Sequence, residues 1–210
     1  MINYILLLLT YLNLDLFYYN KYNFINFVIW KGYNKANIDY INFSNILIKQ
    51  GKKHNINFNV TISDNYDLNE IKYNTILFGH SYGGFKCLEY NNSKLIAKIV
   101  YGATHNTYKK IKHVNKIDKD NIPTLTMIGN KDGIFSPSHL NDEIYDNYIF
   151  KKKYQHTILV NNTNHLCICN NKVSYLSKFL AIKDNNLDID PNLMINAICN
   201  IIIYYIKFIL

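Results

Sequence analysis

The chain has 210 residues, of which 49% are hydrophobic and 18% charged, a balance that suits one globular domain and excludes an intrinsically disordered chain. Its formal net charge is +8, yet it contains no arginine. Because nucleic-acid recognition draws on the forked contacts of arginine, we interpret the charge as a solvated lysine-rich surface and expect no nucleic-acid partner.

The first segment in chain order is an apolar stretch over residues 1–19. It is interrupted by Asn13 and Asp15, and neither a basic leader nor a small-residue cleavage site accompanies it. A membrane-spanning helix needs about twenty apolar residues. We therefore interpret the stretch as a first structural element, with a membrane anchor as the alternative.

From Phe24 onward, apolar β-rich runs alternate with helical patterns. Such alternation predicts a mostly parallel central sheet covered by helices on both faces, that is, an α/β fold of three layers, αβα, in a single domain over residues 1–210. A helix over 39–51 should be capped by Asp39 and stopped by Gly51. The predicted strands cover 24–30, 56–62, 75–78, 95–102, 124–130 and 154–160, and further helices follow the glycines near 84, cover about 138–150 and begin near 191.

The C-terminal helix is apolar, but Asn196, Asn200 and Lys207 fall on one stripe. This pattern favours a helix buried on one face over a membrane tail.

Four cysteines lack the paired spacing of a zinc site, and Cys167 and Cys169 alternate after His165. We interpret the cysteines as buried free thiols and not metal ligands, which suggests a reducing, cytoplasmic compartment.

Three polar residues follow three of the predicted strands: Ser81 in "GHSYG", Asp132 in "GNKDG" and His165 in "NNTNH". Ligands bind outside the carboxyl ends of parallel strands, so these residues can converge at one edge of the sheet. Serine needs a base to take its proton, imidazole serves near neutral pH, and a carboxylate orients the imidazole. The pattern therefore indicates nucleophilic catalysis by Ser81, His165 and Asp132.

Each residue also has a structural interpretation. Ser81 is a good N-cap for the helix that follows it. Asp132 stands in a sequence with strong turn chemistry, and His165 is open to interpretation as an ordinary loop histidine. His80, inside the glycine-flanked turn, is expected to pack beside the nucleophile.

With these motifs, the chain resembles the α/β-hydrolase superfamily on its esterase and lipase side. Gly79-His80-Ser81-Tyr82-Gly83 is similar to that family's nucleophile elbow, and the resemblance spans roughly residues 24–165. It implies a strained strand-to-helix turn at Ser81. It also implies an oxyanion hole made of the backbone N–H of Tyr82 and a second N–H at Gly32 or Tyr33, where many members carry His-Gly and this chain has Lys31-Gly32.

The expected function is hydrolysis of a carboxylic ester or thioester through an acyl-enzyme, without cofactor or metal. The stretches 103–121 and 170–190 leave room for only a small lid or none, which suits small-molecule or lipid esters. The alternative is a ligand-binding protein with an idle triad. We expect a cytoplasmic protein. Contact with a membrane surface, through the apolar ends and the lysines, is an open alternative. The sequence leaves the oligomeric state open.

Overall fold

The computed structural model describes residues 24–63, 71–104, 122–135, 137–138, 140–141, 155–169 and 189–210. The apolar segment 1–19 and the lysine-rich stretches 108–120 and 151–153 lie outside the described residues. So do nearly all of the two candidate lid segments and most of the helix expected over 138–150. The predictions made for them, and the assignment of all 210 residues to one domain, stay predictions.

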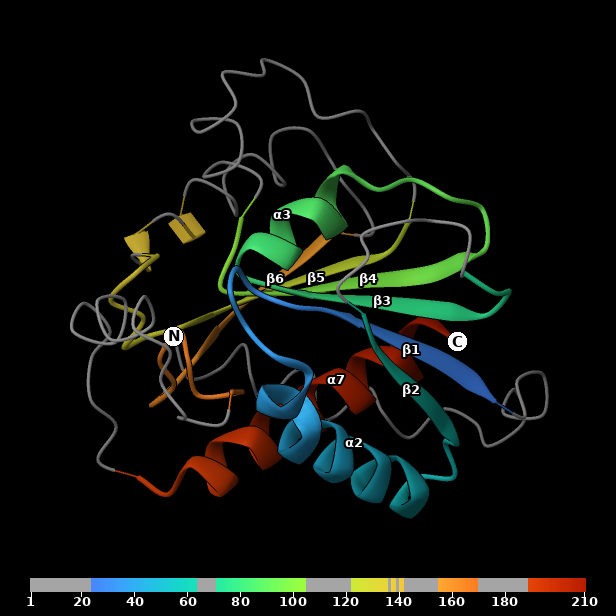
Figure 1. Cartoon of the computed structure of the whole chain (residues 1–210), viewed down its shortest axis with the longest axis horizontal. Helices are drawn as coiled ribbons and strands as arrows, with labels where there is room; N and C mark the ends of the chain where they lie inside the picture. Colours follow the sequence, from blue (N-terminus) through green and yellow to red (C-terminus); the bar gives the residue numbers. More distant parts are fainter. Residues whose placement is uncertain are drawn as a thin grey trace.

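The centre of the molecule is a six-stranded sheet in the order β2-β1-β3-β4-β5-β6, and every neighbouring pair of strands is parallel (Figure 1). Every residue of β3 and β5 is buried, as expected for parallel strands covered on both faces. The strands are β1 (Ile25–Trp30), β2 (Phe58–Ser63), β3 (Thr75–His80), β4 (Leu95–Tyr101), β5 (Thr124–Gly129) and β6 (Gln155–Val160).

Helices cover the two faces of this sheet. Helices α2 (Ile41–Lys53) and α7 (Pro191–Ile209) pack together on one face, and α3 (Tyr82–Glu89) lies on the other (Figure 1). Each face encloses its own apolar cluster: Phe27, Phe43 and Ile198 belong to the α2–α7 side, and Leu77 and Phe85 to the α3 side. The predicted three-layer α/β class is confirmed.

A helix does form where one was predicted over 39–51, but Asp39 and Gly51 do not begin and end it as predicted. Asp39 accepts the N–H of Ala36 at 2.9 Å and so caps the short 3-10 helix η2 (Asn37–Tyr40), after which α2 begins. Gly51 is buried inside α2 and does not end it. A Cβ there would lie 2.6 Å from the ring of Phe58, so close packing against β2 explains this glycine.

Among the described helices, α7 is long and apolar enough to cross a membrane by length and composition alone, but 44% of the relevant window is buried inside the protein. Its buried side chains, including Ile198 and Ile202, join the main core. On the other side, Asn196 accepts a hydrogen bond from Gln50 of α2 at 2.6 Å. The predicted one-sided burial of the last helix is confirmed.

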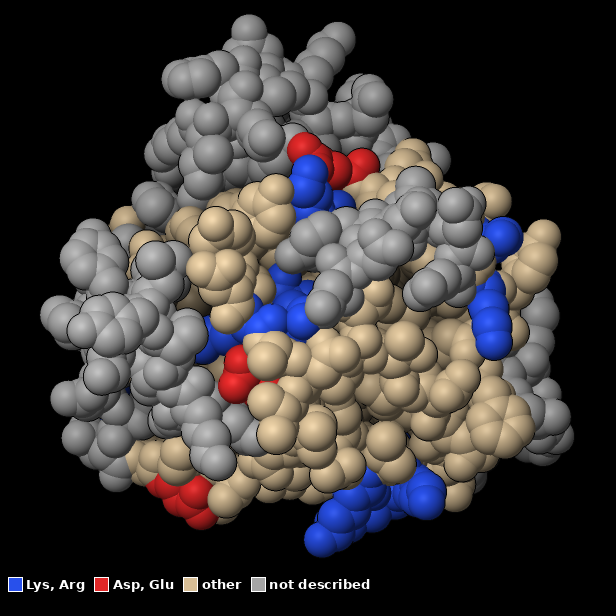
Figure 2. Space-filling model, in the orientation of Figure 1, with Lys and Arg blue, Asp and Glu red and all other residues tan. Residues whose placement is uncertain are grey.

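Lysines on the face shown in Figure 2 lie in separate groups with uncharged surface between them. The described part of this face therefore presents no continuous basic stripe of the kind that tracks a phosphate backbone. The absence of a nucleic-acid partner remains a prediction, since the two lysine-rich stretches lie outside the described residues.

Candidate active site

The residue that follows β3, Ser81, has an unusual backbone conformation. Its φ is +53° and its ψ is −118°, a region that L-residues with a side chain rarely occupy. Among the described residues with positive φ, the others are four asparagines and Gly102, residue types that tolerate such angles. Strain of this kind at a single serine is typical of a functional position.

The side chain of Ser81 does not cap α3, although the residue occupies the N-cap position. The capping interpretation of Ser81 is therefore wrong for this structure. Within the described part of the chain, its hydrogen bonds are made by the backbone: the N–H donates to the carbonyl of Tyr101 at 2.9 Å, and its own carbonyl accepts from Phe85. The hydroxyl is left without an intramolecular partner there.

Two glycines of the elbow allow α3 to approach the sheet. A Cβ on Gly79 would lie 2.5 Å from the carbonyl oxygen of Gly83, and a Cβ on Gly83 would lie 2.3 Å from that of Trp30. Backbone atoms cannot yield as a flexible side chain can, so neither position tolerates a side chain. The glycines therefore set how sharply the chain turns at Ser81.

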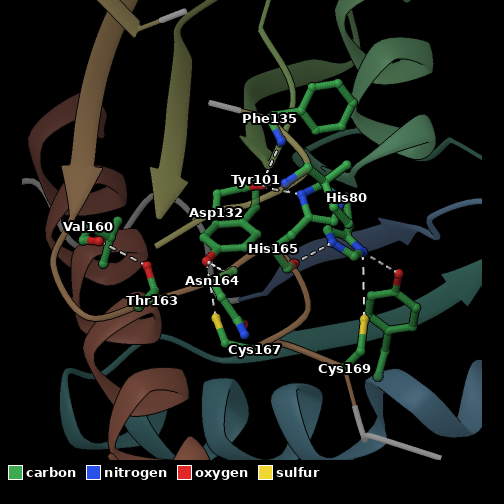
Figure 3. Close-up of polar contacts among 12 residues, drawn as sticks. His80, Tyr101, Asp132, Phe135, Val160, Thr163, Asn164, His165, Cys167 and Cys169 are labelled. Carbon is green, nitrogen blue, oxygen red and sulfur yellow. Dashed lines mark hydrogen bonds and ion pairs between the residues drawn. The ribbon is translucent and has the colours of Figure 1, made fainter. Parts of the chain in front are cut away.

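Asp132 and His165 form a buried pair at the same edge of the sheet (Figure 3). Nδ1 of His165 lies 2.9 Å from Oδ2 of Asp132, and the two residues are only 2% and 3% exposed. The other carboxylate oxygen, Oδ1, accepts the backbone N–H of Ile134 at 2.9 Å and of Phe135 at 2.7 Å. Because the carboxylate can only accept, Nδ1 of His165 is the donor in this pair, and in the neutral ring Nε2 is then the acceptor.

The loops that carry Asp132 and His165 are joined by hydrogen bonds. Lys131 N–H donates to the carbonyl of Thr163 at 3.0 Å, and Asn162 N–H donates to the Asn130 side chain at 2.7 Å. Thr163 itself donates its hydroxyl to Val160. These hydrogen bonds tie the loop of Asp132 to the loop of His165.

Ser81 and His165 both lie against the end of β4. The N–H of Ser81 bonds to the carbonyl of Tyr101, and the next residue, Gly102, lies against the imidazole of His165. A Cβ on Gly102 would be 2.6 Å from Cε1 and Nδ1 of that ring, and φ of Gly102 is +67°. All three predicted catalytic residues therefore lie around one short piece of backbone. Sequence reasoning did not assign Gly102 to the site, because its role depends on a contact between distant segments.

His80 is buried, and its ring packs against that of His165, a contact that its place in the elbow next to Ser81 did not predict. The two rings have centroids 5.0 Å apart, and Nε2 of His80 lies 3.0 Å from the carbonyl oxygen of His165. Its Nδ1 lies 2.6 Å from the hydroxyl of Tyr40 and 3.6 Å from Sγ of Cys169. Burial, with His165 as a second cause, holds the pKa of His80 well below its usual range. His80 is therefore neutral and hydrogen-bonded on both nitrogens.

The three candidate oxyanion donors differ in their surroundings. The N–H of Gly32 donates to the hydroxyl of Tyr40 at 2.8 Å, so this donor is already occupied. Tyr82 is the first residue of α3, so its N–H belongs to the N-terminal turn of that helix. Tyr33 lies in the adjacent loop, and its ring meets that of Tyr82 edge to face with centroids 6.1 Å apart. Tyr82 and Tyr33 remain the candidate pair.

The four cysteines are buried and form no disulfide. Within the described ranges, no group of three or more His, Cys, Asp or Glu side chains is arranged to hold a metal ion. Cys167 instead lies 3.1 Å from the hydroxyl of Tyr101, and Cys169 lies near His80 (Figure 3). Both thiols therefore pack beneath the candidate site.

The fold and site together define an α/β protein with a serine, a histidine and an aspartate at the carboxyl edge of a parallel sheet. No protein-family model matches the chain, and no curated protein matches it. Among solved structures, it is similar to a protein of Pectobacterium atrosepticum described as a "putative yden-like hydrolase", with 12% identity, a TM-score of 0.41, and coverage of 78% of this chain and 94% of that chain. At this identity and TM-score, the similarity supports no conclusion on activity.

Proposed function

We propose that the protein is a serine hydrolase of the α/β-hydrolase type that cleaves carboxylic esters or thioesters. The observation that carries the proposal is the buried Asp132–His165 pair, 2.9 Å apart, at the sheet edge where Ser81 has φ of +53°. A carboxylate behind an imidazole, beside a serine on a strained turn, is the arrangement that activates a hydroxyl for acyl transfer.

The reaction would proceed in two half-reactions. Ser81 Oγ attacks the acyl carbon while Nε2 of His165 takes its proton, and the tetrahedral oxyanion accepts hydrogen bonds from the N–H groups of Tyr82 and Tyr33. The proton then passes from His165 to the leaving alcohol or thiol, which leaves an acyl group on Ser81. Water attacks this ester with His165 again as base, which releases the acid and restores the serine.

The hydroxyl of Ser81 is not hydrogen-bonded to His165 among the described contacts. Catalytic hydrogen bonds are often long or poorly aligned without substrate and tighten in the complex. The position of both residues against Tyr101 and Gly102 supports a short approach once a substrate is bound.

The surroundings of Ser81 favour a substrate with an apolar part. Tyr33 and Tyr82 are 61% and 37% exposed, and their paired rings stand beside the proposed oxyanion donors. Small-molecule and lipid esters both fit this description, and a lipid ester agrees with membrane-surface contact by a cytoplasmic protein. Graded chain lengths in an ester panel would separate the two kinds of substrate.

A fluorophosphonate probe tests the proposal without a guess at the substrate. Such probes phosphonylate an activated serine, so we expect wild-type protein to be labelled and Ser81→Ala to be inert. Ser138→Ala, which alters an exposed serine, is the matched control and should label like wild type. Folded wild-type protein that resists labelling would refute the hydrolase and favour a ligand-binding protein with an idle triad.

A further inference from the structure

Two buried side chains, Tyr40 and His80, connect the loop after β1 to the loop that carries His165. The hydroxyl oxygen of Tyr40 accepts the N–H of Gly32 at 2.8 Å. It lies 2.6 Å from Nδ1 of His80, whose Nε2 lies 3.0 Å from the carbonyl oxygen of His165. Tyr40 and His80 are 0% and 1% exposed, so water does not compete for these hydrogen bonds.

Each proton in this chain of hydrogen bonds can be assigned. The carbonyl of His165 can only accept, so Nε2 of His80 carries the hydrogen and Nδ1 accepts from the hydroxyl of Tyr40. Burial holds the pKa of Tyr40 well above its usual value and that of His80 well below. Both groups therefore stay neutral near neutral pH, and the hydrogen bonds run in one direction from Gly32 to His165.

The same contacts orient the neighbouring N–H of Tyr33. Gly32 is held on both sides, because its N–H bonds to Tyr40 and its carbonyl accepts the N–H of Lys35 at 3.2 Å. In a trans peptide, the carbonyl of Gly32 and the N–H of Tyr33 point in opposite directions. A Cβ on Gly32 would lie 3.3 Å from that of Ser81, so this fixed peptide is adjacent to the nucleophile.

We propose that Tyr40 and His80 are positioning residues, which hold the oxyanion-binding loop at Tyr33 and the base His165 at a fixed separation around Ser81. The proposal rests on the serine-hydrolase function above. Neither residue touches the substrate. Tyr40 acts through the Gly32 peptide, and His80 acts through the backbone of His165, whose ring is held from the other side by Asp132.

The first test is Tyr40→Phe, which removes the hydroxyl and keeps the ring. With p-nitrophenyl acetate as probe, kcat per fluorophosphonate-titrated site should fall about ten- to a hundredfold, the size expected when an active-site group is displaced by a fraction of an ångström. KM should change little. Affinity for phenylboronic acid, which forms a tetrahedral anionic adduct with serine, should fall in parallel with kcat/KM.

Tyr205→Phe is the matched control. Tyr205 is also buried, in α7, and its hydroxyl has no hydrogen-bond partner among the described residues. Loss of that hydroxyl should leave both kcat per site and boronic-acid affinity at wild-type values. The comparison removes the general effect of deleting a buried tyrosine hydroxyl.

Two substitutions of His80 separate the two ends of the connection. Glutamine can place a donor near the position of Nε2 and keep the contact with His165, whereas asparagine can place an acceptor near Nδ1 and keep the contact with Tyr40. We expect boronic-acid affinity to fall in His80→Gln and to stay closer to wild type in His80→Asn. Adding Tyr40→Phe to His80→Gln should cost less than the sum of the two single losses, because the connection to His80 is already broken and only the Tyr40–Gly32 hydrogen bond remains to be lost.

The outcomes are distinguishable from failure of the hydrolase itself. Wild-type protein that does not label refutes both proposals. Wild-type labelling together with Tyr40→Phe that keeps kcat per titrated site and boronic-acid affinity within twofold refutes positioning alone. A variant that only lowers the titrated fraction, with unchanged kinetics per site, also refutes positioning, because the hydroxyl then serves stability only.

Discussion

At the scale of single residues, the site combines strain with fixed proton positions. Ser81 has a backbone conformation that costs about 1–3 kcal/mol in comparable cases, and the rest of the elbow must hold it there. Asp132 has both oxygens occupied, one by His165 and one by two backbone N–H groups. Each of these features predicts the effect of a particular substitution.

Replacing the acid should disable the base without unfolding the protein. In Asp132→Asn, the amide oxygen can still accept the N–H groups of Ile134 and Phe135, while its NH₂ faces Nδ1 of His165. The ring must then carry its proton on Nε2 and cannot accept the proton of Ser81. We expect the rate of phosphonylation to fall by about 10⁴, as measured by stopped-time gel labelling.

Asp190→Asn is the control, because it alters an aspartate that caps α7 and should label at the wild-type rate. An Asp132→Asn variant that labels within tenfold of wild type while folded would contradict the role of Asp132 as orienting acid.

The backbone strain at Ser81 should be measurable as a difference in the free energy of unfolding between two variants. Ser81→Gly and Ser81→Ala both lack the hydroxyl, but only glycine is relaxed at φ of +53°. The glycine variant should therefore be more stable to urea than the alanine variant by about 1 kcal/mol.

Ser44, buried within α2, provides the reverse comparison. There Ser44→Gly should be less stable than Ser44→Ala by about 0.5–1 kcal/mol, because glycine is unfavourable in a helix interior. If glycine were no better than alanine at Ser81, the elbow would not be strained.

At the scale of elements, the site depends on how closely α3 approaches the ends of the strands. Helix α3 begins directly at Tyr82, and the Cα of Gly83 lies against the backbone carbonyls of Trp30 and Lys31. The end of β1 and the start of α3 thus share the space that a side chain would fill. This contact brings the end of β1, and the loop at Tyr33 that follows it, next to the N-terminus of α3.

Gly83→Ala should therefore destabilise the protein and disturb the site together. Its Cβ would lie 2.3 Å from the carbonyl oxygen of Trp30, which forces α3 away from β1. Overpacking of this kind typically costs about 1–3 kcal/mol, measured by urea unfolding. Lys86→Ala, in the same helix but with its side chain about one-third exposed, should stay within about 0.5 kcal/mol of wild type. Equal stability of the two variants would contradict the close approach.

At the scale of the whole molecule, the parallel sheet brings three distant loops to one edge, and the side chain of His80 is buried among them. His80 is enclosed by the elbow, by Tyr40 from the α2 side, and by His165 and Cys169 from the last loop. Its burial links the protonation of one side chain to the stability of the entire fold.

Stability should fall as the pH is lowered below about 6.5, the ordinary histidine value. The folded protein holds the pKa of His80 well below that of the unfolded chain, so the unfolded state binds a proton that the folded state does not. Above that pH, His80 contributes no loss. Below it, and down to the folded pKa, His80 contributes a loss of up to about 1.4 kcal/mol per pH unit.

Urea unfolding at several pH values measures this effect. His80→Gln should flatten the pH dependence below 6.5, although it lowers stability at pH 8. His156, which is half-buried and also has its pKa lowered by burial, adds a second, smaller loss that His156→Gln should remove. An unchanged slope in His80→Gln would show that His80 is not a source of acid sensitivity.

The alternation of strands and helices, the parallel sheet and the order of serine, aspartate and histidine could all be predicted from the amino-acid sequence. Buried strands and elbow glycines leave local signals, because burial and sharp turns restrict the residue types that fit. The limits of η2 and α2 were not predicted correctly. Asp39 caps the 3-10 helix η2 and not α2, and Gly51 lies inside α2, where it packs against Phe58 of β2.

The contacts among the residues around Ser81 became known from the folded structure alone. Three contacts join segments that are far apart in the chain. The Gly32 N–H donates to Tyr40, Gly102 lies against His165, and His80 hydrogen-bonds to the backbone of His165. Such contacts follow from the packing of the sheet and its loops, and no local pattern records them. Hydrogen-bond geometry depends on distances in space, and those distances are set by the whole fold and not by any short stretch of sequence.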